Sequence, residues 1–247
     1  MAAEDHRTML PSRHQTALLL DLDGTLLDIA PRPDAVVVPP GLLDTLRRLR
    51  TSFREALAVV SGRPVEQIDT LLHDAPYAVA GEHGGTIRHA PGETIERADL
   101  PRPPDAWLEE AARIVELNPG ALLERKEHGF VLHYRAAPEL GSRLKDALTP
   151  LVAGSERFVL MPARKAWEVK PRAADKGIAV AKLMERAPFA GRLPLFIGDD
   201  VTDEDGIAVA EQHGGAGLRV PATFGDAAGV RAWLAKAAGM EAGWPAW

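Results

Sequence analysis

Acidic residues directly follow two apolar segments that lie far apart in the sequence. The carboxylates are supplied by LLLDLDGT (18–25) and by LPLFIGDDVTDED (193–205), and they are Asp21, Asp23, Asp199, Asp200 and Asp203. Carboxylates are costly to desolvate without a partner. Hard oxygen donors in a chain without cysteine suit Mg²⁺. We therefore expect the two segments to meet around a divalent cation.

Besides the acids, the sequence offers a hydroxyl and an ammonium group that could bind a phosphoryl group. Ser61 follows the apolar run LAVV in VVSGR, and Lys176 opens a helical pattern in DKG. With Mg²⁺ they could hold a phosphoryl group, whose transfer depends on positioning and charge neutralisation. A carboxylate can attack phosphorus and form an acyl phosphate, while a second acid protonates the leaving oxygen. A free Asp titrates near ~3.9, and we expect crowding by phosphate and other carboxylates to raise the pKa of Asp23.

Alternating strands and helices would position these groups. Apolar segments predict strands at 17–23, 57–62, 77–81, 193–200 and 216–220, and helical periodicity falls between them, at 41–50, 64–72, 176–187, 203–213 and 226–237. Continuous apolar strands alternating with helices indicate an α/β fold with a doubly wound parallel sheet. Ligands bind such sheets beyond the carboxyl ends of the strands. This rule brings the acids, Ser61 and Lys176 into one predicted site.

The middle of the chain has a different pattern. Helix, hairpin, helix and hairpin signals follow one another, which predicts a smaller inserted α+β cap domain over residues 102–171. The core would then comprise residues 17–101 and 172–247. Asp23 and Ser61 are 38 positions apart, too close for an insertion between them, whereas the 115 positions from Ser61 to Lys176 leave ample room.

Composition limits the class of protein. The chain has 247 residues, no cysteine and a formal net charge of −6, which argues against a nucleic-acid or anionic membrane surface. Residues 1–16 lack the apolar core of a signal peptide and are predicted to form a flexible leader. We expect a cytoplasmic monomer with no nucleic-acid or membrane partner.

The motifs DLDGT, SGR, KG and GDDVTDED, in this order, resemble the four signatures of haloacid-dehalogenase-type phosphatases. The resemblance implies that Asp21 is the nucleophile and Asp23 the general acid and base. Ser61 and Lys176 would bind phosphoryl oxygens. Mg²⁺ would be held by the carboxylates of Asp21 and Asp199 and by the Asp23 carbonyl, with Asp200 and Asp203 supporting it directly or through water.

Three further stretches are similar to the trehalose-6-phosphate phosphatase family: GEHGG (81–85), LERKEHGFVLHYR (123–135) and ARKAWEVKP (163–171). The resemblance implies a sugar-phosphate substrate, with the distal glucose held by Glu124, Lys165 and Glu168. Arg63 and Lys170 would contact substrate or bridge the domains. The full set of expected substrate-binding residues is Thr25, Gly62, Arg63, Glu82, His83, Glu124, Lys126, His133, Arg135, Lys165, Glu168 and Lys170.

Hydrolysis of trehalose 6-phosphate is the leading functional hypothesis. Within the same class, the substrate could instead be sucrose 6-phosphate or a glycosyl or mannosyl phosphoglycerate. A phosphotransferase or mutase is a different class, but such enzymes tend to carry a helical lid soon after the first strand, and the short interval from Asp23 to Ser61 disfavours one. An inactive binding module would be expected to lack an aspartate, and none is missing.

Overall fold

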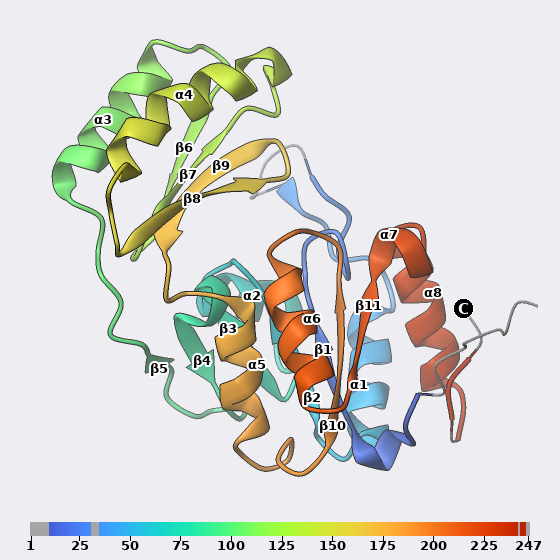
Figure 1. The fold of residues 1–247 in the computed structure, drawn as a ribbon. Helices are drawn as coiled ribbons and strands as arrows, with labels where there is room; N and C mark the ends of the chain where they lie inside the picture. Colours follow the sequence, from blue (N-terminus) through green and yellow to red (C-terminus); the bar gives the residue numbers. More distant parts are fainter. Residues whose placement is uncertain (1–9, 31–34, 242, 246–247) are drawn as a thin grey trace, which may run out of the picture.

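A seven-stranded mixed sheet forms the centre of the larger unit (Figure 1). The structure is a computed structural model, and it describes the chain except for residues 1–9, 31–34, 242 and 246–247. The strands, in their order across the sheet, are β11 (Ala216–Arg219), β10 (Leu193–Gly198), β1 (Thr16–Leu20), β2 (Leu57–Val60), β3 (Ala78–Gly81), β4 (Thr86–Arg88) and β5 (Glu96–Arg97). Strands β11 to β3 pair in parallel, as predicted, whereas β4 and β5 add an antiparallel edge.

Helices cover both faces of this sheet, which confirms the doubly wound α/β architecture. One face is covered by α1 (Leu42–Ser52), α2 (Val65–Leu72) and α8 (Ala227–Ala238), and the other by α5 (Lys176–Met184) and α6 (Asp203–Gln212). Side chains alternate along β1, so Leu18 and Leu20 enter the first core while Ala17 and Leu19 enter the second. Because β1 is buried on both faces, it reads as a continuous apolar run in the sequence.

A second, four-stranded antiparallel sheet belongs to a smaller unit, which we call the cap (residues 105–171). Its elements are α3 (Asp105–Glu116), β6 (Leu122–Arg125), β7 (Phe130–His133), α4 (Gly141–Val152), β8 (Phe158–Ala163) and β9 (Ala166–Pro171). The strand order is β6-β7-β9-β8. Both helices pack on one face of the sheet around a separate apolar cluster, and the cap stands over one end of the core (Figure 1). That the boundaries at 101/102 and 171/172 separate two domains stays a prediction.

The end of the expected flexible leader is ordered, and Arg13 and Thr16 in it are buried. Residues 1–9 lie outside the described part of the chain, but Arg13–Gln15 form a short 3₁₀ helix and Thr16 already belongs to β1. The Arg13 guanidinium donates hydrogen bonds to the carbonyl oxygens of Ala237, Met240 and Gly243, at 2.7, 3.0 and 2.7 Å. The prediction of a leader was therefore wrong for residues 13–16, because a polar sequence gives no sign that backbone carbonyls at and beyond the end of a distant helix will accept hydrogen bonds from it.

Replacing this arginine should destabilise the fold. Arg13→Ala removes three charge-assisted hydrogen bonds to buried or partly buried carbonyl oxygens, so we expect the free energy of unfolding to fall by about 3 kcal/mol. Urea denaturation followed by circular dichroism measures the loss. Arg48→Ala, at an exposed position on α1, is the matched control and should stay within about 0.5 kcal/mol of the parent chain. An equal effect of the two substitutions would contradict a stabilising role for Arg13.

Within the described residues, no helix is both long and apolar enough to cross a membrane.

Candidate active site

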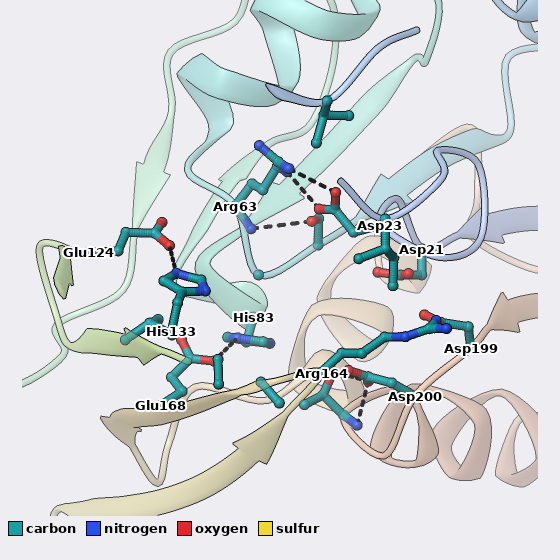
Figure 2. Close-up of a pocket in the computed structure, with 18 of the residues that line it drawn as sticks. Asp21, Asp23, Arg63, His83, Glu124, His133, Arg164, Glu168, Asp199 and Asp200 are labelled. Atoms are coloured by element: carbon teal, nitrogen blue, oxygen red, sulfur yellow. Dashed lines mark hydrogen bonds and ion pairs between the residues drawn. The ribbon is translucent and has the colours of Figure 1, made fainter. Parts of the chain in front are cut away.

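Three aspartates meet where β1 and β10 end. These strands pair in parallel, with Leu20 beside Ile197, so the residues that follow them leave the sheet at the same edge. One carboxylate oxygen from each of Asp21, Asp199 and Asp203 lies within 4.8 Å of the other two. Figure 2 shows Asp21 and Asp199 on the same side of the cavity. The structure thus brings together the two acidic segments that the sequence places 178 positions apart.

Two glycines make room for this cluster. Gly24 has a φ of +91°, and a Cβ built on it would lie 2.2 Å from Asp199 Oδ2. A Cβ at Gly198 would lie 2.2 Å from the carboxyl carbon of Asp203. Since either side chain would displace a carboxylate, glycine is required at both positions. These are the glycines of the DLDGT and GDD motifs.

Lys176 supplies a positive charge at the base of the cluster. Its Nζ lies 2.6 Å from Asp21 Oδ1 and 2.6 Å from Asp203 Oδ1, and all three side chains are almost fully buried. Burial lowers the pKa of Lys176, but the two carboxylates raise it by more, so the side chain stays charged. The side chain of Asp175, the residue before α5, accepts a hydrogen bond from Ile178 N at 2.7 Å and so fixes the start of the helix that carries Lys176.

The loop after β10 is organised by Asp203. Its Oδ2 accepts hydrogen bonds from the backbone amides of Asp199, at 3.0 Å, and Asp200, at 3.1 Å. Asp200 Oδ1 turns instead to Thr202, accepting from its N–H at 2.8 Å and its hydroxyl at 2.7 Å. Asp200 is therefore outside the three-acid cluster, although it lines the same cavity.

Asp23 forms a two-pronged ion pair with Arg63 (Figure 2). The distances are 2.6 Å from Nε to Oδ2 and 2.8 Å from Nη2 to Oδ1. Ser61 Oγ accepts a hydrogen bond from the Arg63 amide at 3.2 Å, and this turns the chain sharply after β2. Hydrogen bonds thus join Ser61 to Arg63 within the SGR motif, and Arg63 to Asp23 of the DLDGT loop.

A cavity of about 190 Å³ lies between the core and the cap. On the core side it is lined by the residues just described, including Asp21, Asp23, Ser61, Lys176 and Asp199. On the cap side it is lined by charged and polar side chains from three strands and their ends: Glu124, Lys126, His133, Arg135, Arg164 and Glu168. The cavity therefore joins an acidic, lysine-containing site to a surface rich in hydrogen-bonding groups.

Paired side chains fix this cap surface. His133 Nε2 lies 2.8 Å from Glu124 Oε2 across the β6–β7 pair. Although burial raises the pKa of Glu124, His133 and Lys126 lower it by more, so the carboxylate stays charged. Arg135 donates a hydrogen bond to the Arg164 carbonyl oxygen at 3.0 Å. These contacts hold the groups in the defined orientations that recognition of a hydroxyl-rich ligand requires.

Arg164 is a cavity residue that the sequence interpretation missed. It is the first residue of the two-residue turn between β8 and β9, and its Nη1 lies 3.4 Å from Asp199 Oδ2 across the gap between cap and core. Figure 2 shows its guanidinium reaching toward Asp199. The sequence could have indicated this role, because Arg164 stands beside Lys165 in a tight hairpin turn.

Lys126, Glu168 and His83 form a buried chain of contacts between cap and core. Lys126 Nζ lies 2.7 Å from Glu168 Oε1, and His83 Nε2 lies 3.1 Å from Glu168 Oε2 (Figure 2 draws the second contact). Burial raises the pKa of Glu168, but Lys126 and His83 hold it well below its usual range. Burial lowers the pKa of His83, against the smaller opposite effect of Glu168. Glu168 and His83 thus line the cavity and also contact each other.

Acid should weaken the fold through His83. Its pKa is lower in the folded chain than the unfolded value near ~6.5, so below that pH the unfolded chain binds the additional proton. The free energy of unfolding should therefore fall from pH 7.5 to pH 5.5, by at most about 1.4 kcal/mol per pH unit from this group. Urea denaturation across this range, with His83→Gln beside the parent chain, measures it. Identical pH profiles for the two chains would contradict the assignment.

Four predicted substrate-binding residues do not line the main cavity: Thr25, Glu82, Lys165 and Lys170. Thr25 is fully buried behind the aspartate loop. Glu82 and Lys170 face a separate cavity of about 20 Å³, and Lys170 donates a hydrogen bond to the Ala174 carbonyl oxygen. Lys165, with a φ of +60°, is exposed in the β8–β9 turn. Strand alternation predicts the faces of a sheet, but not which residues of a turn point inward.

The three-acid cluster fits a hard divalent cation. Burial, together with Asp200 and Asp203, raises the pKa of Asp199 to about 7. Burial and the Asp203 carboxylate also raise the pKa of Asp21. These raised pKa values show that the positive charges of Lys176 and Arg164 do not fully balance the negative charges of the acids. An all-oxygen donor set with excess negative charge is the kind that binds hard divalent cations.

The fold and the site together define a phosphatase of the haloacid-dehalogenase type. Among solved structures, the C-terminal domain of C. albicans trehalose-6-phosphate phosphatase is similar to this chain, with a TM-score of 0.79 at 22% identity over 92% of this chain and 93% of that one, which confirms the fold. The chain belongs to the trehalose-phosphatase family, whose model matches residues 19–233. Members of this family are phosphoric monoester hydrolases.

Two curated relatives support the assignment. The trehalose-6-phosphate phosphatase of Escherichia coli K12 is 38% identical over 208 residues, which cover 83% of this chain and 77% of the relative. A probable trehalose-phosphate phosphatase of Sinorhizobium fredii is 36% identical over the same shares of the two chains. The family suggested by the sequence motifs is thus confirmed.

Proposed function

We propose that this chain hydrolyses trehalose 6-phosphate to trehalose and phosphate, through a phosphorylated Asp21 and with Mg²⁺. The observation that carries the proposal is the shared cavity, which is lined on the core side by the aspartates and Lys176 and on the cap side by polar and charged side chains. The family membership supports the substrate. The residue roles below are parts of the proposal.

Asp21 is the nucleophile. One of its carboxylate oxygens attacks phosphorus while the bond from phosphorus to the sugar oxygen breaks, and Asp23, in its protonated form, gives its proton to that oxygen. Water then attacks the phosphorus of the acyl phosphate, Asp23 takes up its proton, and inorganic phosphate leaves with the Asp21 carboxylate restored. The phosphoryl dianion competes with Asp23 for Arg63, which frees Asp23 to face the leaving oxygen.

Ser61 and Lys176 orient the phosphoryl oxygens, since a hydroxyl and an ammonium group both donate hydrogen bonds. Mg²⁺ would be held by Asp21, Asp199 and the Asp23 carbonyl, and it would neutralise charge on the phosphoryl group. Asp203 supports this site, because its oxygens are already bonded to Lys176 and to two loop amides.

The cap binds the sugar. Glu124, His133 and Arg135 present donors and acceptors at the cavity, as a disaccharide with many hydroxyl groups requires. A small phosphate ester could not reach these groups to form further hydrogen bonds with them, so the cap surface favours a large sugar ester.

Phosphate release from a panel of sugar esters tests the proposal. We expect turnover of trehalose 6-phosphate to exceed that of sucrose 6-phosphate and mannosyl phosphoglycerate. Turnover of either alternative with none of trehalose 6-phosphate would reassign the substrate.

Removing the metal should stop the same reaction. Chelation with EDTA should lower the rate by roughly 100-fold or more, because the buried carboxylates would then repel the phosphoryl dianion. Added Mg²⁺ should restore it. An unchanged rate after chelation would contradict a metal requirement. The control is binding of EDTA-treated protein to Mg²⁺ by calorimetry, which shows that the metal was removed.

A further inference from the structure

The turn after β2, residues 61–63, is held by hydrogen bonds to each of its three carbonyl oxygens. The backbone amides of His83 and Glu82 donate to the first and third carbonyls, at 3.0 Å each. Both donors belong to the core. The donor to the middle carbonyl, that of Gly62, is Lys126 Nζ at 3.1 Å, and it comes from the cap. A residue of the cap therefore completes the support of a turn in the core.

The Lys126 ammonium group is itself fixed. Its side chain is only 12% exposed, and Nζ lies 2.7 Å from Glu168 Oε1. Burial lowers the pKa of Lys126, but Glu168 and Glu124 raise it by more, so it remains a cationic donor. The other oxygen of Glu168 contacts the His83 ring at 3.1 Å. The contacts thus run from the turn through Lys126 and Glu168 and return to the core at His83.

The His83 ring also packs directly against the turn. A Cβ built on Gly62 would lie 2.7 Å from two atoms of that ring, so no side chain could be accommodated there without moving the ring. The backbone of His83 is in the left-handed region, with a φ of +55°, a conformation that costs free energy outside glycine. The ring and the turn therefore fix each other's positions.

We propose that Lys126 is a positioning residue for the phosphoryl-binding turn. By holding the Gly62 carbonyl oxygen, it keeps the Ser61 hydroxyl in its place at the cavity, so the seating of the cap sets the geometry of phosphoryl binding. This inference rests on the proposed function, in which Ser61 binds the phosphoryl group. It differs from a role as a sugar ligand alone, because it predicts an effect on an anion that has no sugar.

Titration of Mg²⁺-loaded protein with inorganic phosphate tests the positioning role of Lys126. Inorganic phosphate has no sugar hydroxyl groups, so a change in its affinity cannot come from a lost contact between Lys126 and the sugar. Lys126→Met leaves the Gly62 carbonyl without this donor, and small displacements of positioning groups have large effects. We expect phosphate affinity by calorimetry to fall about 10-fold. Lys126→Arg keeps a cationic donor and should recover most of the affinity. Lys145→Met, at an exposed position on α4 of the cap, is the matched control and should bind phosphate as the parent chain does.

A second measurement separates positioning from general destabilisation. If Lys126 acts through the turn, Lys126→Met should have little further effect in a Ser61→Ala background, because the group it positions is gone. Equal losses in both backgrounds, or unchanged phosphate affinity in Lys126→Met, would overturn the proposal. Should Lys126→Met fail to fold, Glu168→Gln weakens the same chain of contacts and should lower phosphate affinity about 3-fold, and an unchanged affinity in that variant would also overturn it.

The outcome is independent of the identity of the sugar. A chain that binds phosphate but does not hydrolyse trehalose 6-phosphate contradicts the proposed function, whereas the comparison of phosphate affinities still decides the role of Lys126.

Discussion

Asp21→Asn is expected to lower phosphate release by roughly 10⁴-fold or more, the range typical of removing a nucleophile. Asp21 and Asp203 both lie in the three-acid cluster and against Lys176, but Asp203 is already held by two loop amides, whereas Asp21 lines the cavity. An amide has no negative charge with which to attack phosphorus. The fold should survive, because asparagine has the same size and Lys176 keeps Asp203 as its partner. Initial rates of phosphate release and a thermal unfolding curve check both parts.

Asp28→Asn is the control for this prediction. Asp28 is exposed and pairs with Arg231 at 3.0 Å, so the same chemical change in the same loop should leave the rate unchanged. Substantial turnover by Asp21→Asn would show that another group is the nucleophile. Mass spectrometry of a rapidly quenched reaction gives independent evidence, since the phosphorylated peptide should contain residue 21.

Lys176→Met is expected to affect both stability and activity. It removes the cation that lies 2.6 Å from each of two buried carboxylates. Breaking one partner of a buried ion pair typically costs about 3–5 kcal/mol, because the remaining charges are left without compensation. We expect a loss of this size in urea denaturation with EDTA present. In the proposed function Lys176 also binds the phosphoryl group, so turnover should fall by roughly 100-fold or more.

Lys236→Met, at an exposed position on α8, is the control that shows how much stability is lost when a lysine without buried contacts is replaced. It should change the free energy of unfolding by less than about 0.5 kcal/mol. If Lys176→Met were as stable as this control, the buried contacts of Lys176 could not be important for folding.

The parallel part of the sheet was predictable because burial on both faces leaves a clear trace in the sequence. β1 and β2 are apolar at every position except Thr16, and the helices between strands show amphipathic periodicity. The antiparallel edge was not predictable in this way, since β4 and β5 have only three and two residues. Hydrogen bonding to β3 decides their conformation, and short polar segments do not reveal such pairing.

The acid cluster was predictable because the ends of parallel strands share one edge of the sheet. The contacts across the cavity were not. Glu168 lines the cavity, as expected for a sugar ligand, but its carboxylate also pairs with His83 of the core. That contact depends on how the cap sits on the core, and local sequence patterns carry no information about the relative placement of two units.

The ionic ties between cap and core differ in their exposure. Arg164, which reaches Asp199, is 62% exposed, whereas the Glu168–His83 pair, which also joins the cap to the core, is almost fully screened from water. Dissolved ions weaken exposed pairs far more than enclosed ones. High ionic strength would thus release the β8–β9 turn of the cap, which carries Arg164, from the core, while the contacts near Lys126 persist. The cap would then tilt about the Lys126 side instead of separating from the core as a whole.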